Sequence, residues 1–224
     1  MGCFERRGRL NGQAASNAAG AVFPMILQAD QMAHADIYRI LIGSIAQRPI
    51  AWAGTRSKNG INNLAPFSFY NCFSAKPPII GFSTIPRSDG RKKDTLQNIL
   101  DTRCFTLNAA SHALVQQMSK SSATLEPDED EFVYAGLTAM QAPHINAPYV
   151  KEALLVFECE LREVISFGNE PGSGNLILGE IKHLIIDDSI YLDGRIDFEK
   201  LDPVGRLAGN WYSTIRDKFE LSRG

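Results

Sequence analysis

The tetrapeptide Ser57-Lys58-Asn59-Gly60 constrains the fold most strongly, because it separates two runs that have the character of β-strands. The first run is RPIAWAGTR at residues 48–56, which begins at a proline, and the second is NNLAPFSFYN at residues 62–71. Asn-Gly tolerates the positive φ angles that a tight hairpin requires. The sequence therefore predicts a β-hairpin in which residues 62–71 form the return strand.

The rest of the chain continues this pattern of strands. Further strands are expected at 79–84, 104–110, 153–167 and 175–194, with Lys76-Pro77-Pro78 breaking the chain before the first and GNEPGSG joining the last two. Helices are expected at 94–102, capped by Asp94 or Thr95, and at 111–122, where the pattern is amphipathic. Many strands in hairpin order with few helices predict a mainly β, antiparallel barrel with attached helices rather than βαβ units.

Composition and charge exclude several classes of function. The net charge of −2 gives no field that would favour nucleic acid or an anionic membrane. No apolar run approaches the roughly 20 residues that cross a bilayer. Residues 1–22 lack the apolar core of a secretory signal and are expected to be a flexible tail before one domain at 23–224. Four cysteines without a C-x-x-C pair suit a reducing compartment, so a cytoplasmic protein is expected.

A basic loop precedes the helix expected at 94–102. It contains Arg87, Arg91, Lys92 and Lys93, and it follows a strand that ends in Ser83-Thr84. The N-terminus of a helix offers unpaired N–H groups and a positive dipole, which basic side chains and hydroxyls complete into an anion site. Two interpretations stay open from these residues alone: a site for a phosphate monoester, or a solvated loop with an ordinary helix cap.

Other candidate motifs favour structural roles. The acidic run Glu126–Glu131 lacks the spacing of a calcium loop and is expected to be a solvated face. His183 and Trp52 are expected to be structural, and no metal site is predicted, because the four histidines lie far apart in the sequence. No acid–base pair or nucleophile triad emerges and no catalytic residue is assigned, so a bound cofactor would supply the chemistry of an enzyme.

Four segments in a fixed order carry a resemblance to one family. RPIAWAGTRSKNGINNLAPFSFYN, FST…RKKDTLQNI, DEFVYAGLT and DGRIDFEKLDPVGRLAGNWYSTIRDKFEL together resemble the flavin reductase-like, FMN-binding split-barrel proteins over residues 37 to 221. The resemblance implies an FMN-binding split β-barrel of antiparallel, Greek-key type. It also implies a homodimer with one FMN per subunit near the dimer interface.

The resemblance further implies which residues form the site. Those expected to bind the cofactor lie in three short segments: Arg48, Pro49, Ile50 and Ala51; Asn63, Leu64, Ala65, Pro66 and Ser68; and Ser83, Arg91, Lys93, Asp94 and Thr95 at the phosphate end. The segment from Gly205 to Tyr212 resembles the part that closes over the flavin, with Asn210, Trp211 and Tyr212 on the substrate side.

The function implied is that of an oxidoreductase. It would take hydride from NADH or NADPH and pass electrons to free flavin or to another acceptor, such as a partner monooxygenase. The nicotinamide need only stack over the flavin, so no G-x-G-x-x-G motif is required. Two alternatives stay open: an electron-carrying or flavin-holding protein of the flavoredoxin type, and a split-barrel relative that binds pyridoxal phosphate or haem.

Overall fold

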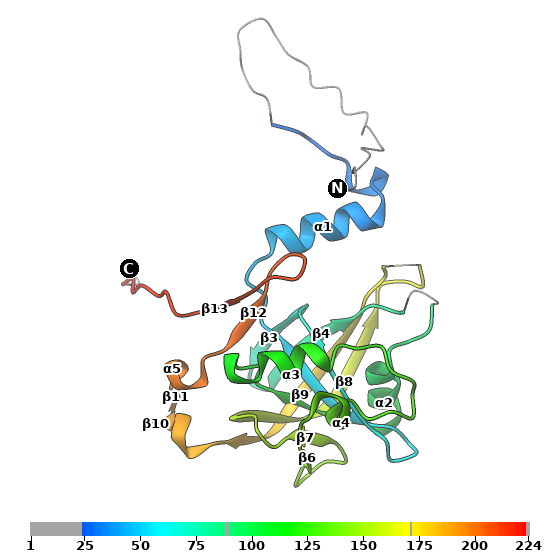
Figure 1. The fold of residues 1–224 in the computed structure, drawn as a ribbon. Coiled ribbons are helices and arrows are strands. Elements are labelled where there is room, and N and C mark those ends of the chain that lie inside the picture. Colours follow the sequence, from blue (N-terminus) through cyan, green and yellow to red (C-terminus); the bar gives the residue numbers. More distant parts are fainter. Residues whose placement is uncertain (1–23, 88–89, 171, 223–224) are drawn as a thin grey trace, which may run out of the picture.

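The centre of the molecule is one antiparallel sheet of seven strands. The computed structural model describes residues 24–87, 90–170 and 172–222, so the tail expected at 1–22 lies outside the described residues. Across the sheet the order is β2-β1-β5-β8-β9-β4-β3. Their bounds are β1 Ala51–Arg56, β2 Asn62–Phe67, β3 Tyr70–Ala75, β4 Pro78–Thr84, β5 Cys104–Asn108, β8 Leu155–Ser166 and β9 Asn175–Ile186 (Figure 1). The predicted antiparallel, mainly β class is confirmed.

The hairpin between β1 and β2 forms as its turn chemistry predicts. Gly60 has a φ of +84°, and the backbone N–H of Ser57 donates to the carbonyl of Ile61 at 2.8 Å. The prediction of one continuous return strand over 62–71 is wrong, however. β2 ends at Phe67 and β3 begins at Tyr70. Pro66 has no N–H to donate, which suits β2 to its place at the edge of the sheet.

At Ser68-Phe69 the chain passes from one edge of the sheet to the other. β2 and β3 are consecutive in the chain, yet they occupy opposite edges of the sheet. β2 also contacts β4, the neighbour of β3, so the sheet curls until its two edges approach each other without pairing. The two residues 68–69 therefore span the gap between the edges.

Apolar side chains from the sheet form two buried clusters. One contains Phe82, Phe105 and Ile177 together with Leu96 and Ile99 of α2. The other is centred on Trp52 and includes Leu64, Met118 and Phe132. The Trp52 side chain is fully buried and its indole Nε1 donates to Ser121 Oγ at 2.9 Å, which confirms its structural role.

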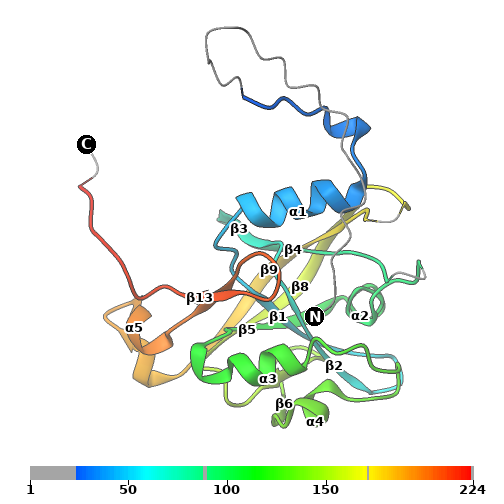
Figure 2. The same ribbon diagram turned by 45° about the horizontal axis from the view of Figure 1, so that its top comes forward.

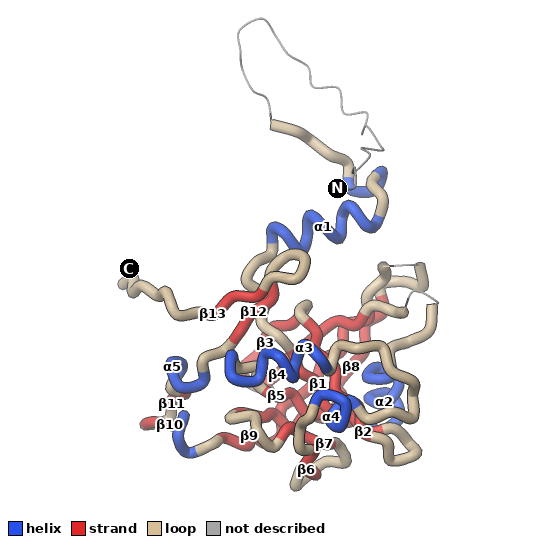
Figure 3. The backbone as a smooth tube through the Cα atoms, in the orientation of Figure 1, coloured by secondary structure: helices blue, strands red, loops and turns tan. Residues whose placement is uncertain are grey.

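Helices pack around this sheet, and the strand content dominates the fold (Figure 3). α2 spans Asp94–Thr102 as predicted, but Lys93 is its N-cap, so the expected cap at Asp94 or Thr95 is wrong. In place of a helix over 111–122 there is a 3-10 turn at His112–Leu114 followed by α3 Val115–Lys120. Further helices are α1 His34–Ser44, α4 Glu131–Ala135 and α5 Phe198–Leu201, with 3-10 turns at Ala29–Gln31 and Asp188–Ile190.

Three short strand pairs complete the fold: β6 Ala139–Gln141 with β7 Pro148–Val150, β10 Tyr191–Leu192 with β11 Arg195–Ile196, and β12 Val204–Arg206 with β13 Tyr212–Thr214. The β12–β13 hairpin lies beside α1 (Figure 2). The buried Arg48 guanidinium joins them by donating to the carbonyls of Ile45 at 2.6 Å and Leu207 at 3.0 Å. In the described part of the chain, no helix combines the length and the apolar character that a membrane span needs.

Candidate functional site

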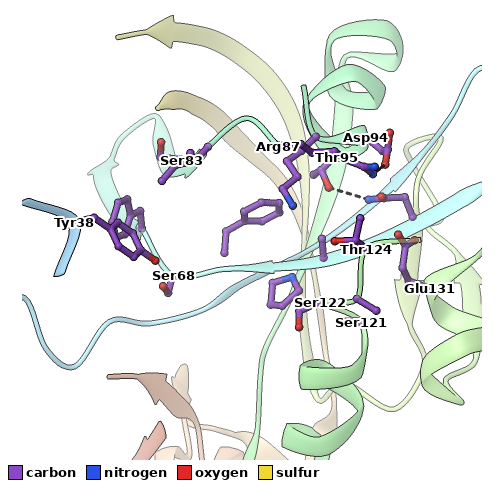
Figure 4. A pocket seen from close by; sticks show the side chains of 18 residues that line it. Tyr38, Ser68, Ser83, Arg87, Asp94, Thr95, Ser121, Ser122, Thr124 and Glu131 are labelled. Atoms are coloured by element: carbon purple, nitrogen blue, oxygen red, sulfur yellow. Dashed lines mark hydrogen bonds and ion pairs between the residues drawn. The ribbon is translucent and has the colours of Figure 1, made fainter. Parts of the chain in front are cut away.

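A cavity of about 310 Å³ opens beside β2, the end of β4 and the start of α2 (Figure 4). Eight of the residues implied by the resemblance line it: Asn63, Ala65, Pro66, Ser68, Ser83, Lys93, Asp94 and Thr95. Ten others complete the lining: Tyr38, Phe67, Phe69, Ile85, Arg87, Ser121, Ser122, Ala123, Thr124 and Glu131. The fold thus brings together residues at β2, at the end of β4 and at the start of α2, which are separated in sequence.

A buried amide network holds one side of the cavity rigid. The Asn63 side-chain Nδ2 donates to Thr95 Oγ1 at 2.9 Å and to Thr55 Oγ1 at 3.0 Å. Asn98 Nδ2 donates to the same Thr55 hydroxyl at 3.1 Å. These bonds join β1, β2 and α2, so the position of the helix start is fixed relative to the strand that lines the cavity.

The start of α2 carries cationic groups. Arg87 is paired through its Nη2 with the carboxylate of Asp94, and Lys93 immediately precedes the helix. Arg87 Nε is buried, yet it has no hydrogen-bond partner among the described residues. A buried, unpartnered guanidinium N–H is costly unless an acceptor reaches it. The cluster is therefore suited to an anionic group such as a phosphate.

Glu131 corrects the expectation for the acidic run. Its side chain is buried in the lining, and its Oε2 accepts the backbone N–H of Leu64 at 3.1 Å, whereas a solvated face was expected. Burial raises the pKa of Glu131 to about 7, and the nearby Asp94 and Asp130 act in the same direction. The local signal was the N-cap: Asp130 Oδ1 accepts the N–H of Phe132 at 2.8 Å, which starts α4 and turns Glu131 inward.

Part of the cavity lining is aromatic or aliphatic. Tyr38 belongs to this part and lies far from Asp94 and Glu131 (Figure 4). Phe67, Phe69 and Ile85 contribute further apolar surface, while Ala65 and Ser68 are small. A larger cavity of about 1040 Å³ adjoins it under α1 and shares five lining residues with it: Tyr38, Phe69, Ile85, Arg87 and Lys93. The arrangement suits a flat, largely apolar ring with an anionic tail.

Comparison with known families agrees with this geometry. Residues 43–200 match the model of the flavin reductase like domain. The chain belongs to the flavin reductase-like family. An uncharacterized protein of Halalkalibacterium halodurans is 38% identical over 201 residues, which are 89% of this chain and 96% of that protein.

Two solved structures show the same fold. Nitrilotriacetate monooxygenase component B from Bacillus cereus has a TM-score of 0.84 and 32% identity, over 92% of this chain and 100% of that chain. A split-barrel-domain protein from Shewanella frigidimarina has a TM-score of 0.75 and 25% identity, over 87% and 96%. The split-barrel prediction is confirmed.

Some residues implied by the flavin reductase-like resemblance lie outside the cavity lining. The side chains of Ile50, Ala51 and Leu64 are buried in the apolar clusters. The Arg48 guanidinium donates to backbone carbonyls, including that of Ile45, and its Nε lies 3.4 Å from Ser68 Oγ. Burial lowers the pKa of Arg48. Pro49 and Arg91 are exposed.

The three residues of the expected substrate side also lie outside this cavity. Asn210, Trp211 and Tyr212 belong to the β12–β13 hairpin, where the Trp211 side chain is 74% exposed. Tyr212 packs against the Trp52 cluster, and the guanidinium of Arg206 lies 4.5 Å from the centre of its ring. Their assignment to the substrate side stays a prediction.

The lining residues that the resemblance did not imply are brought to the cavity by tertiary packing. Ser121 and Ser122 reach the cavity from the end of α3, but their hydroxyls donate to the carbonyls of Met118 and Ser119. Their role is to shape the wall. The sequence did indicate Arg87, because this residue belongs to the basic loop before the helix.

Proposed function

We propose that this chain binds FMN in the cavity and takes hydride from NADH or NADPH, passing the electrons to free flavin or to another acceptor. The observation that carries the proposal is that one cavity contains Arg87 Nε, which has no hydrogen-bond partner among the described residues, and the small side chains of Ala65 and Ser68. A cationic start of a helix suits the phosphate, and small side chains leave room for the ring.

The roles of the residues follow from where they lie. Arg87 Nε, Lys93 and the first N–H groups of α2 would hold the phosphate, and Thr95, fixed by Asn63, would orient it. Ala65, Pro66 and Ser68 would carry the ring, with Tyr38 and Phe69 excluding water beside it. When bound, the flavin supplies the redox chemistry, and the protein supplies binding, orientation and electrostatics.

Glu131 lines the cavity, and its pKa of about 7 lies near neutrality. The carboxyl group would gain or lose a proton according to the charge of the bound ligand. The hydrogen bond that it accepts from Leu64 N–H would hold it in place. We assign it no proton-transfer step.

We further propose that the active form is a homodimer. Ile40 and Leu41 of α1 and its C-cap residue Ile45 are exposed to solvent, and Trp211 is exposed on the hairpin next to this helix. Contact with a second copy would bury these side chains, and the hairpin segment with Asn210, Trp211 and Tyr212 would close over the flavin from the partner subunit.

The similar Bacillus cereus protein is named as component B of a monooxygenase. This name supports a partner monooxygenase as the electron acceptor of this chain. Use of NADH or NADPH, which are cytoplasmic reductants, would place the chain in the cytoplasm.

Anaerobic mixing of the FMN-loaded protein with NADH, and separately with NADPH, tests the proposal. A reductase loses the absorbance of its oxidised flavin within turnover times with at least one of the two nucleotides. A flavin that stays oxidised with both, yet is reduced by dithionite, would identify an electron carrier and reject the reductase.

A further inference from the structure

Two histidines and a glutamate that are far apart in sequence meet on the sheet, away from the cavity. His144 lies in the loop between β6 and β7, Glu158 lies on β8, and His183 lies on β9. None of the three lines the cavity described above. Glu158 pairs with His183 across the strands, and the register shifts immediately afterwards, between Glu158 and Cys159. Such a bulge re-aims the side chains beside it.

The donor atoms of these residues converge. Glu158 Oε2 lies 2.8 Å from His144 Nδ1 and 3.1 Å from His183 Nδ1. One ligand atom from each residue lies within 4.8 Å of those of the other two. The two imidazole rings are stacked, with centroids 3.7 Å apart and an angle of 16° between their planes. The loop therefore places its histidine directly over that of the sheet.

The buried carboxylate of Glu158 is the feature that favours a bound cation. The Glu158 side chain is 0% exposed. Among the described residues, its hydrogen-bond and ion-pair partners are the two imidazoles and the backbone N–H of His144, whose nitrogen lies 3.3 Å from Oε1. A buried carboxylate is costly unless a positive charge compensates it. The neighbouring Lys182 is instead paired with Glu180 and Glu160.

The donor set matches a transition metal rather than calcium or magnesium. Imidazole nitrogen with one carboxylate oxygen is a ligand set that zinc accepts, whereas hard cations take oxygen ligands only. In a tetrahedral zinc site with bonds of about 2.0–2.1 Å, neighbouring ligand atoms lie about 3.3 Å apart, close to the two contacts found here. The side chains of His144 and His183 are 53% and 45% exposed, which leaves access for water as a fourth ligand.

We propose that His144, Glu158 and His183 bind a divalent transition-metal ion, with Zn²⁺ as the best fit. The ion fastens the loop of residues 142–147 to the β8–β9 hairpin. The competing interpretation is a hydrogen-bonded contact that holds no ion. The two differ in one measurable property, the stoichiometric uptake of metal.

Isothermal titration with ZnCl₂ of chelator-treated, dialysed protein tests the site. The protein carries serine at Cys3 and at the exposed Cys72, because free thiols also bind zinc. We expect one Zn²⁺ per chain and a rise in the melting temperature on binding. His144→Gln and His183→Gln should each raise the dissociation constant at least about tenfold, since loss of an outer-shell partner alone costs that much.

His112→Gln is the matched control. His112 is also exposed and also has a single carboxylate nearby, Asp202, but at 3.9 Å and with no second histidine. Its substitution should leave zinc binding unchanged, and circular dichroism should show all three variants folded. Absence of stoichiometric binding by the parent protein would overturn the proposal. So would equal zinc affinity in the His144, His183 and His112 variants.

Discussion

Lys92 and Lys93 are adjacent in the sequence but differ in their surroundings. Lys93 precedes α2 directly and lines the cavity, whereas Lys92 is exposed and does not line it. We predict that Lys93→Ala raises the dissociation constant for FMN about 10- to 150-fold, because a hydrogen bond to a charged group is worth about 1.5–3 kcal/mol. Lys92→Ala should change it little. Fluorescence titration measures both, and equal effects of the two variants would remove Lys93 from the phosphate site.

The titration of Glu131 should make the free energy of unfolding depend on pH. Its pKa is about 7 in the folded chain against an ordinary value of 4.5, so the folded state binds more protons between these values. The stabilising contribution is full below the lower value and is lost as pH rises through the higher one. Glu131→Gln keeps an acceptor for Leu64 N–H and removes this titration.

The expected result is that the free energy of unfolding of Glu131→Gln gains on that of the parent as pH rises from about 5 to about 8. Urea denaturation at several pH values measures it. The exposed Glu126→Gln is the control and should give a difference that does not vary with pH. A pH-independent difference for Glu131→Gln would show that its pKa is ordinary.

At the scale of elements, Thr55 joins β1 to both β2 and α2. Its hydroxyl accepts from the side-chain amides of Asn63 and Asn98, at 3.0 and 3.1 Å, and is fully buried. Thr55→Val has the same shape but leaves both amide donors without this acceptor. We predict a loss of about 1–3 kcal/mol in the free energy of unfolding, measured in urea. Thr55→Ser keeps the hydroxyl and should lose much less, and an equal loss in both variants would assign the effect to packing.

Elements that depend on local chemistry could be predicted from the sequence, and those that depend on distant contacts could not. The β1–β2 hairpin follows from Asn59-Gly60, and α2 has the predicted bounds, although its cap is Lys93 and not Asp94 or Thr95. The break at Ser68-Phe69 was missed, because only the closure of the sheet shows that the chain must cross there. The pairing of His144 with His183 likewise exists only in the folded chain.

The same distinction holds within the candidate site. Lys93, Asp94 and Thr95 were found because a basic loop before a helix is a local pattern. The assignment of Arg48 to the cofactor stays a prediction, but the contacts of its guanidinium with the carbonyls at the end of α1 and in the loop after β12 could not be predicted. That use of an arginine depends on two segments that approach only in the folded molecule.

At the scale of the whole molecule, α1 exposes an apolar face. The side chains of Ile40, Leu41 and Ile45 are 49%, 40% and 58% exposed. We predict a dimer, with a mass in solution about twice the chain mass of 24.7 kDa. Ile45→Glu should shift it toward the monomer, whereas Val133→Glu, on α4, should not. Light scattering after gel filtration measures the mass, and a monomeric parent protein would contradict the dimer.

The most direct test of the account is the titration of the purified, flavin-free protein with FMN, followed by flavin fluorescence. The account predicts a saturable change in fluorescence that ends at one FMN per chain. Fluorescence that follows free FMN throughout the titration, with no saturation, would contradict it.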